Sequence, residues 1–223
     1  LVRQAMYYAI DVPAIIEFVC DGAGVPTGTS MYPANEKYFI PELAERYPHD
    51  VEKAKELLAQ AGYPDGFEMS ITVPSNYTQH VETAEVIAEQ LKEVGITANI
   101  NPVEWQTWYQ DAYRGREYEA TVSAIAADDM TAREMLARYM TEDRKNFINF
   151  SDSEYDEVLV QAMAATDEEE QTRLYKRAEE ILNEQAASLW IQDMCELVVM
   201  NPKLDGFTFY RTYVLDMSTI YYK

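Results

Sequence analysis

The sequence predicts an α/β fold in which a largely parallel sheet is flanked by helices. Two helix-then-strand units follow each other between residues 50 and 103, and a third strand-like segment comes at 118–126. In each unit, apolar residues first recur at helical spacing and then alternate along a short run that stops at a proline. Strands that alternate with helices along a chain favour parallel pairing, with the helices packed on the faces of the sheet.

The segments before these units predict two short helices and a long connection. Asp11 breaks the first twenty residues into two helices and suits the N-cap of the second, which has Pro13 in its first turn. Residues 21–48 are rich in Gly, Pro, Ser and Thr, which is typical of a surface connection. Their glycines lack the spacing and the preceding strand of a dinucleotide-binding motif.

The two central units have clear boundaries. Asp50 is the predicted N-cap of the first helix, Gly62 ends this helix, and the strand that follows stops at Pro74. The second helix closes at Gly95, and its strand stops at Pro102. The apolar helical positions are Val51, Ala54, Leu57, Leu58 and Ala61, then Val81, Ala84, Ile87, Ala88, Leu91 and Val94; the alternating strand positions are Phe67, Met69, Ile71 and Val73, then Ile96, Ala98 and Ile100.

The C-terminal part is predicted to be mostly helical and then extended. A short helix is expected after residue 103, and two helices carry apolar stripes that start at Tyr155 and at Leu174. Ser153 or Asp152 suits the N-cap of the first, and Thr166 with Glu169 predicts a capping box for the second. Residues 188–202 read as extended structure with a turn, and 203–223 as a strand-like tail that needs an edge to pair with.

Composition excludes several classes of partner. The 223 residues carry a formal charge of −21, which repels nucleic acid and anionic lipid. No window approaches the roughly 18 apolar residues of a membrane span, and no basic stretch leads into an apolar one as in a signal peptide. Because the chain begins at Leu1 inside a helical pattern, we expect a processed or excised segment.

The usual catalytic and metal-binding patterns are absent from the sequence. Its two histidines, His49 and His80, lie beside predicted helix starts and are expected to face solvent, and no HExxH, GxSxG or Cys/His cluster occurs. We therefore predict no catalytic residue, no metal site and no cofactor. Cys20 and Cys195 are either unbonded thiols or one long-range disulfide.

Polar and aromatic residues follow each predicted strand, where a parallel sheet presents its ligand-binding loops. Asn76 and Tyr77 follow the first strand, Trp105 the second, and Asp128 with Asp129 the third. Aromatic walls, an amide and an anion suit the recognition of a polar or cationic small molecule better than bond-making. One of the two aspartates alternatively caps the next helix, and the nearby second tryptophan of the segment, at position 108, is expected in the core.

Five segments then carry a family resemblance. The chain contains, in order, VRQAMYYAID followed by AII, YPHDVEKAKELLAQAGYPDGFEMSI, AEVIAEQLKEVGITANINPVEW, NFSDSEYDEVLVQA and NPKLDGF. In order and spacing these resemble the C-terminal lobe of the ABC-importer solute-binding proteins of the oligopeptide, dipeptide and nickel group, family 5. The resemblance implies one lobe of a periplasmic-binding-protein-like type II fold over residues 1–202, and a tail, 203–223, that returns to an N-terminal lobe.

The resemblance also implies a function. It indicates a non-enzymatic binder, periplasmic or extracellular and tethered as a lipoprotein, which delivers a small polar solute, most often a peptide, to ABC permease subunits. Asp128 matches the family aspartate that pairs with a peptide α-amino group. Ile125 replaces the tryptophan of that motif and no proline follows, so oligosaccharides, nickel complexes and opines stay open as solutes. The alternative from another class is a protein-interaction module that docks a partner through its tail.

Overall fold

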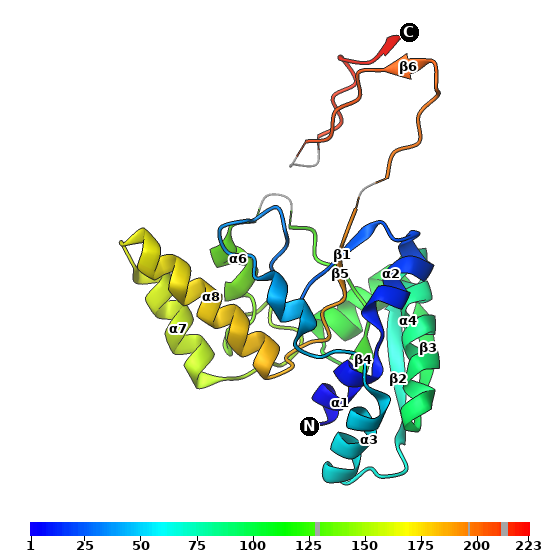
Figure 1. The fold of residues 1–223 in the computed structure, drawn as a ribbon, viewed down its shortest axis with the longest axis vertical. Helices are drawn as coiled ribbons and strands as arrows, with labels where there is room; N and C mark the ends of the chain where they lie inside the picture. The colour runs from blue at the N-terminus through cyan, green and yellow to red at the C-terminus, as the bar shows by residue number, and fades with distance from the viewer. Residues whose placement is uncertain (128–129, 196, 211–213) are drawn as a thin grey trace.

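A three-stranded parallel sheet lies at the centre of the molecule, in the order β3–β2–β4. The structure is a computed structural model that describes residues 1–127, 130–195, 197–210 and 214–223. The predicted α/β class with a largely parallel sheet is confirmed, and helix α4 connects β2 to β3 (Figure 1). The strands of the sheet are β2 (Phe67–Pro74), β3 (Ile96–Val103) and β4 (Ala120–Thr121).

Four of the α-helices, α2, α3, α7 and α8, begin at an aspartate that caps them. Asp11 accepts from Ala14 N at 3.0 Å and Asp50 from Lys53 N at 2.9 Å, which confirms both predicted caps. The α-helices are α1 (Val2–Ala9), α2 (Val12–Cys20), α3 (Val51–Gln60), α4 (Thr78–Leu91), α5 (Trp105–Thr107), α6 (Ala132–Ala137), α7 (Ser153–Ala164) and α8 (Glu168–Glu184); η1 (Pro41–Glu45) and η2 (Lys92–Val94) are 3-10 turns, and η3 (Trp108–Arg114) is wound as a π-helix.

The N-caps of the last two helices, α7 and α8, test two specific predictions. Asp152 caps α7 by accepting from Tyr155 N at 2.9 Å, one of the two predicted possibilities. The capping box predicted for Thr166 is wrong by one residue, because α8 begins at Glu168 and Asp167 accepts from Glu170 N at 2.9 Å.

The third strand is much shorter than the predicted 118–126. β2 pairs with β3 along its whole length, from Phe67 to Pro74, but β4 pairs with β2 only through Ala120 and Thr121. At the start of the segment a side chain replaces backbone pairing. Glu119 Oε2 accepts hydrogen bonds from both the backbone N and the hydroxyl of Ser70, each at 2.7 Å. A carboxylate therefore satisfies a strand N–H that a longer β4 would have paired.

The buried side chains form two clusters. One lies between the sheet and helices α1–α4 and includes Ile71, Leu91 and Ile96. The other joins α6, α7 and α8 and includes Leu136 and Leu159. Figure 1 shows α7 and α8 side by side, away from the sheet. The sheet cluster supports the strand ends at which the candidate site lies.

The connection predicted to lie on the surface is partly buried. β1 (Gly24–Pro26) pairs antiparallel with β5 (Gln192–Met194), and Met31 has no exposed surface. Thr29 Oγ1 donates to Glu179 Oε2 at 2.9 Å, and Asn183 Nδ2 donates to Gly28 O at 2.7 Å. The prediction for residues 21–48 is wrong in the middle of the segment because α8 supplies partners for its polar groups.

The cysteines decide between the two predicted states, and the described part of the tail forms a short hairpin. Cys20 is buried and Cys195 exposed, and both are free thiols, so the disulfide alternative does not hold. In the tail, β6 (Leu204–Asp205) pairs antiparallel with β7 (Tyr221–Tyr222), and Figure 1 shows this hairpin standing apart from the rest of the chain. The described part of the tail thus pairs with itself.

Candidate ligand-binding rim

The ends of β2 and β3 meet at one edge of the sheet. Pro74 lies opposite Val103, and Ser75 N donates to Val103 O at 2.8 Å. The chain then turns, with Tyr77 N donating to Pro74 O at 3.3 Å, and Asn76 lies exposed within that turn. The residues that follow the two strands are therefore held beside each other by backbone hydrogen bonds.

Tyr77 and Trp105 form an aromatic edge on this rim. Their ring centroids are 5.6 Å apart and the planes meet at 82°, an edge-to-face contact. Tyr77 is 43% exposed and Trp105 40% exposed. The structure thus brings together two of the residues predicted for the site, and both are partly exposed. Their contact with a solute stays a prediction.

A buried tryptophan supports this edge. Trp105 stacks on Trp108 at 5.2 Å between centroids, and Trp108 is only 3% exposed, so its predicted place in the core is confirmed. Trp108 Nε1 donates to Thr121 Oγ1 at 2.9 Å, and Thr121 Oγ1 donates to Thr72 O at 2.6 Å. The orientation of the exposed rings is thereby fixed to two strands of the sheet.

His80 packs beside Tyr77 and is half-buried, so the prediction that it faces solvent does not hold for its Nδ1. Its ring centroid is 4.9 Å from that of Tyr77, and its Nδ1 is buried without a hydrogen-bond partner in the described part of the chain. Burial lowers the pKa of His80, because the imidazolium would lose its hydration. The first turn of α4 therefore places beside Tyr77 an imidazole for which burial favours the neutral form.

The predicted anions, Asp128 and Asp129, lie outside the described residues. Their alternative role as the N-cap of the next helix is wrong, because α6 begins at Ala132 and is capped by Thr131. Thr131 and Glu134 form a complete capping box, in which Glu134 N donates to Thr131 Oγ1 at 3.3 Å. The ligand-anchoring role of the aspartates stays a prediction.

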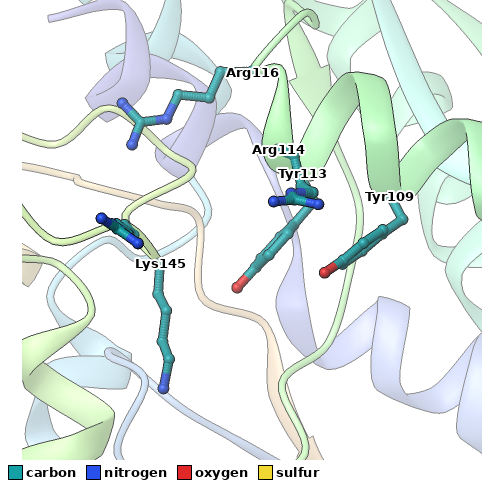
Figure 2. A pocket seen from close by; sticks show the side chains of 6 residues that line it. Tyr109, Tyr113, Arg114, Arg116 and Lys145 are labelled. Atoms are coloured by element: carbon teal, nitrogen blue, oxygen red, sulfur yellow. The ribbon is translucent and has the colours of Figure 1, made fainter.

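Sequence reasoning missed an open basic pocket beside the rim. The aromatic row continues from Trp105 to Tyr109 at 6.2 Å and from Tyr109 to Tyr113 at 5.6 Å. Figure 2 shows the pocket at the end of this row. We call it the basic pocket; its lining residues are Tyr109, Tyr113, Arg114, Arg116, Arg144 and Lys145. No sequence pattern signalled it, because its two walls come from separate segments.

Within the described residues we find neither a metal site nor a membrane span, and the rim is suited to holding a solute. Across the described ranges, His, Cys, Asp and Glu side chains form no group able to hold a metal ion. Nor does any helix in those ranges combine the length and the hydropathy of a membrane span. Rings and an amide at a strand end can hold a solute by packing and hydrogen bonding.

Comparisons with known proteins identify the family of the chain. The family described as bacterial extracellular solute-binding proteins, family 5, matches residues 1–147. Heme-binding protein A of Haemophilus influenzae is 31% identical over 92% of this chain, which spans 38% of that protein. Di/tripeptide-binding protein 1 of Pseudomonas aeruginosa is 32% identical over 82% of this chain and 35% of its own length.

Solved structures extend the likeness to the whole chain. A dipeptide-binding protein from a Pseudoalteromonas species, in complex with Met-Leu, has a TM-score of 0.83 and 26% identity over 100% of this chain and 45% of its own. The protein AgaA from A. tumefaciens, in complex with agropinic acid, has a TM-score of 0.78 and 28% identity over 93% of this chain and 43% of its own.

The chain therefore spans less than half the length of these relatives. The predicted type II periplasmic-binding-protein fold is confirmed, as part of one such fold. Proteins of this family are periplasmic or extracellular solute-binding proteins. Because the family match covers residues 1–147 of 223, the chain belongs to family 5 of the bacterial extracellular solute-binding proteins.

Proposed function

We propose that this chain is one lobe of the solute-binding component of an ABC importer, which captures a peptide or a similar small polar solute between two lobes and delivers it to permease subunits. Residues 1–202 form the C-terminal lobe, and the tail, 203–223, returns to the N-terminal lobe. The observation that carries the proposal is the half-exposed Tyr77 and Trp105 pair at the ends of two parallel strands.

Each rim residue has a distinct role in this proposal. Tyr77 and Trp105 pack against the solute, Asn76 donates or accepts hydrogen bonds, and Asp128 with its neighbour Asp129 supplies negative charge for an amine. A well-bonded amine and carboxylate pair loses about 2 to 5 kcal/mol when one partner is removed. Asp128 is therefore the largest single contributor to affinity for a peptide.

The proposal includes no chemical step. The protein acts by binding and release in the periplasm or outside the cell, held to the membrane by a lipid anchor. Relatives whose names specify dipeptides and tripeptides support a peptide as the solute, while the protein in complex with agropinic acid supports a wider class of small organic acids.

Calorimetry of the complete two-lobed protein with a dipeptide mixture tests these roles. Asp128→Asn is expected to weaken binding at least about tenfold, and Trp105→Ala about fivefold, because a charge pair and an aromatic contact are lost. Asp65→Asn and Tyr63→Ala are matched controls, since both residues are exposed and lie before the start of β2, at the opposite end of the strand from the rim. Unchanged affinity in both site variants would show that the solute binds elsewhere.

The tail supports a second candidate, a protein-interaction module. Its large apolar side chains are exposed: Phe209, Leu215, Met217, Tyr221 and Tyr222 are each more than half exposed. Such a surface needs a cover, which the first proposal assigns to the N-terminal lobe. Sedimentation of this chain with and without residues 203–223 separates the two: self-association that disappears with the tail supports an interaction surface, and a monomer in both cases disfavours it.

A further inference from the structure

The basic pocket is an open hollow of about 560 Å³ between two walls. One wall is η3 with the turn after it, which carries Tyr109, Tyr113, Arg114 and Arg116. The other is the loop 141–149, which carries Arg144 and Lys145. Figure 2 shows the hydroxyls of Tyr109 and Tyr113 pointing toward the side from which Lys145 comes.

The charge of this pocket opposes that of the molecule. The chain has a formal charge of −21, yet the lining contains four cations and no carboxylate. Within the described residues, these four cationic side chains of the pocket form no ion pair. Other lysines and arginines do: Lys37, Arg46, Lys53, Lys55, Lys92, Arg173, Arg177 and Lys223. The pocket cations are therefore available to an external anion.

The two walls are fixed to each other before any ligand arrives. Tyr118 Oη donates to Phe147 O at 2.7 Å, and the ring of Tyr113 lies 5.0 Å from that of Phe147. Arg116 Nη1 donates to Asn149 Oδ1 at 3.0 Å. A fixed pocket loses little conformational entropy on binding, which favours affinity for a matching ligand.

The loop wall is also braced from within. Asn146, 2% exposed, donates through Nδ2 to Met140 O at 3.0 Å and to Phe150 O at 2.7 Å, and accepts from Phe150 N at 3.2 Å. This side chain closes the loop that presents Arg144 and Lys145. The positions of the two cations thus follow from a buried amide.

The aromatic side of the pocket suits the remainder of a ligand. Tyr109 and Tyr113 stack at 5.6 Å with 13° between their planes, and the Arg114 guanidinium lies 5.9 Å from the Tyr109 ring. Guanidinium groups bind carboxylates and phosphates through paired N–H donors, and ring faces cover apolar parts.

We propose that the basic pocket binds small molecules that carry several carboxylate or phosphate groups, with the oxyanions between the cations of the two walls. This inference does not rest on the proposed function of the rim, because the observations behind it concern the residues of the basic pocket alone.

Calorimetry of the 223-residue chain with citrate at low ionic strength tests the proposal, with inorganic phosphate as competitor. We expect a Kd below about 1 mM, and weaker binding as salt is raised. The double variant Arg114→Gln/Arg144→Gln removes one cation from each wall and is expected to weaken citrate binding about tenfold.

The control is Lys92→Gln/Arg173→Gln, which removes the same charge from two exposed side chains paired with carboxylates elsewhere. It is expected to change citrate affinity less than about twofold. Equal losses in the two double variants would mean that only net charge matters, and absence of citrate binding by the parent chain would overturn the proposal. Thermal unfolding of each variant verifies that it is folded.

Discussion

The indole N–H of Trp108 donates to the hydroxyl of Thr121 at 2.9 Å. The same hydroxyl donates to Thr72 O at 2.6 Å, so one side chain joins η3 to two strands. Trp105 rests on Trp108, and Tyr77 meets Trp105 edge to face. The exposed rings of the rim are thus positioned by a hydroxyl that is itself hydrogen-bonded to the sheet.

Thr121→Val is expected to destabilise the chain by about 1 to 3 kcal/mol, because it removes both bonds and leaves a buried indole N–H unpaired. Urea unfolding measures the loss. Thr121→Ser keeps the hydroxyl and is the control, expected to lose much less. A loss in Thr121→Val no larger than that in Thr121→Ser would contradict the role of the hydroxyl, because Val keeps the methyl group that Ser lacks.

His80 should make stability depend on pH. Burial lowers its pKa, so the folded state excludes a proton that the unfolded chain accepts. The stabilisation is complete above the usual histidine pKa and is lost as pH falls through the lower folded value. His80→Gln should therefore flatten the fall in unfolding free energy between about pH 7.5 and pH 5.

The other histidine is the matched control for this titration. His49 is half-exposed, and its Nδ1 lies 4.0 Å from Asp11 Oδ2. His49→Gln is expected to leave the part of the slope that His80 causes. A wild-type slope in His80→Gln would contradict the assignment, and because the chain has two histidines, their proton resonances report each pKa directly.

Local patterns predicted the elements but not what holds distant segments together. The alternation from Phe67 to Val73 encodes a strand with one buried face, and Asp50 encodes a helix start, because both signals lie within a few residues. The burial of Thr29 depends on Glu179, far along the chain, and so leaves no local signal.

The candidate site likewise has parts that the sequence predicts and parts that it does not. Tyr77 and Trp105 were predictable because parallel strands align their ends. The length of β4 was not, since the Glu119 side chain replaces backbone pairing there. The basic pocket was also out of reach, because the contact of Phe147 with Tyr113 that forms it joins separate segments.

Two glycines between α3 and β2 should differ in their tolerance of alanine. Gly66 has φ +76°, and a Cβ there would lie 1.9 Å from Gly95 O, so Gly66→Ala must displace backbone. Gly62 has φ +93° with open space around it. We expect Gly62→Ala to cost about 1 kcal/mol and Gly66→Ala clearly more than 2 kcal/mol in chemical unfolding. Equal costs would show that left-handed strain alone matters.

Glu179 should oppose folding in alkaline solution. Burial raises its pKa to about 8, with Thr29 Oγ1 donating to Oε2 and Oε1 left buried without a partner among the described residues. The folded state thus prefers the protonated carboxyl. The stability that depends on this protonation is full below the unfolded pKa and is lost as pH rises through about 8.

Glu179→Gln keeps an acceptor for Thr29 without a charge. The free energy of unfolding of this variant should therefore exceed that of the parent by about 2 to 4 kcal/mol at alkaline pH and differ little under acidic conditions. Exposed Glu93→Gln controls for net charge, and an equal gain from that variant, measured by urea unfolding across the pH range, would contradict the role of burial.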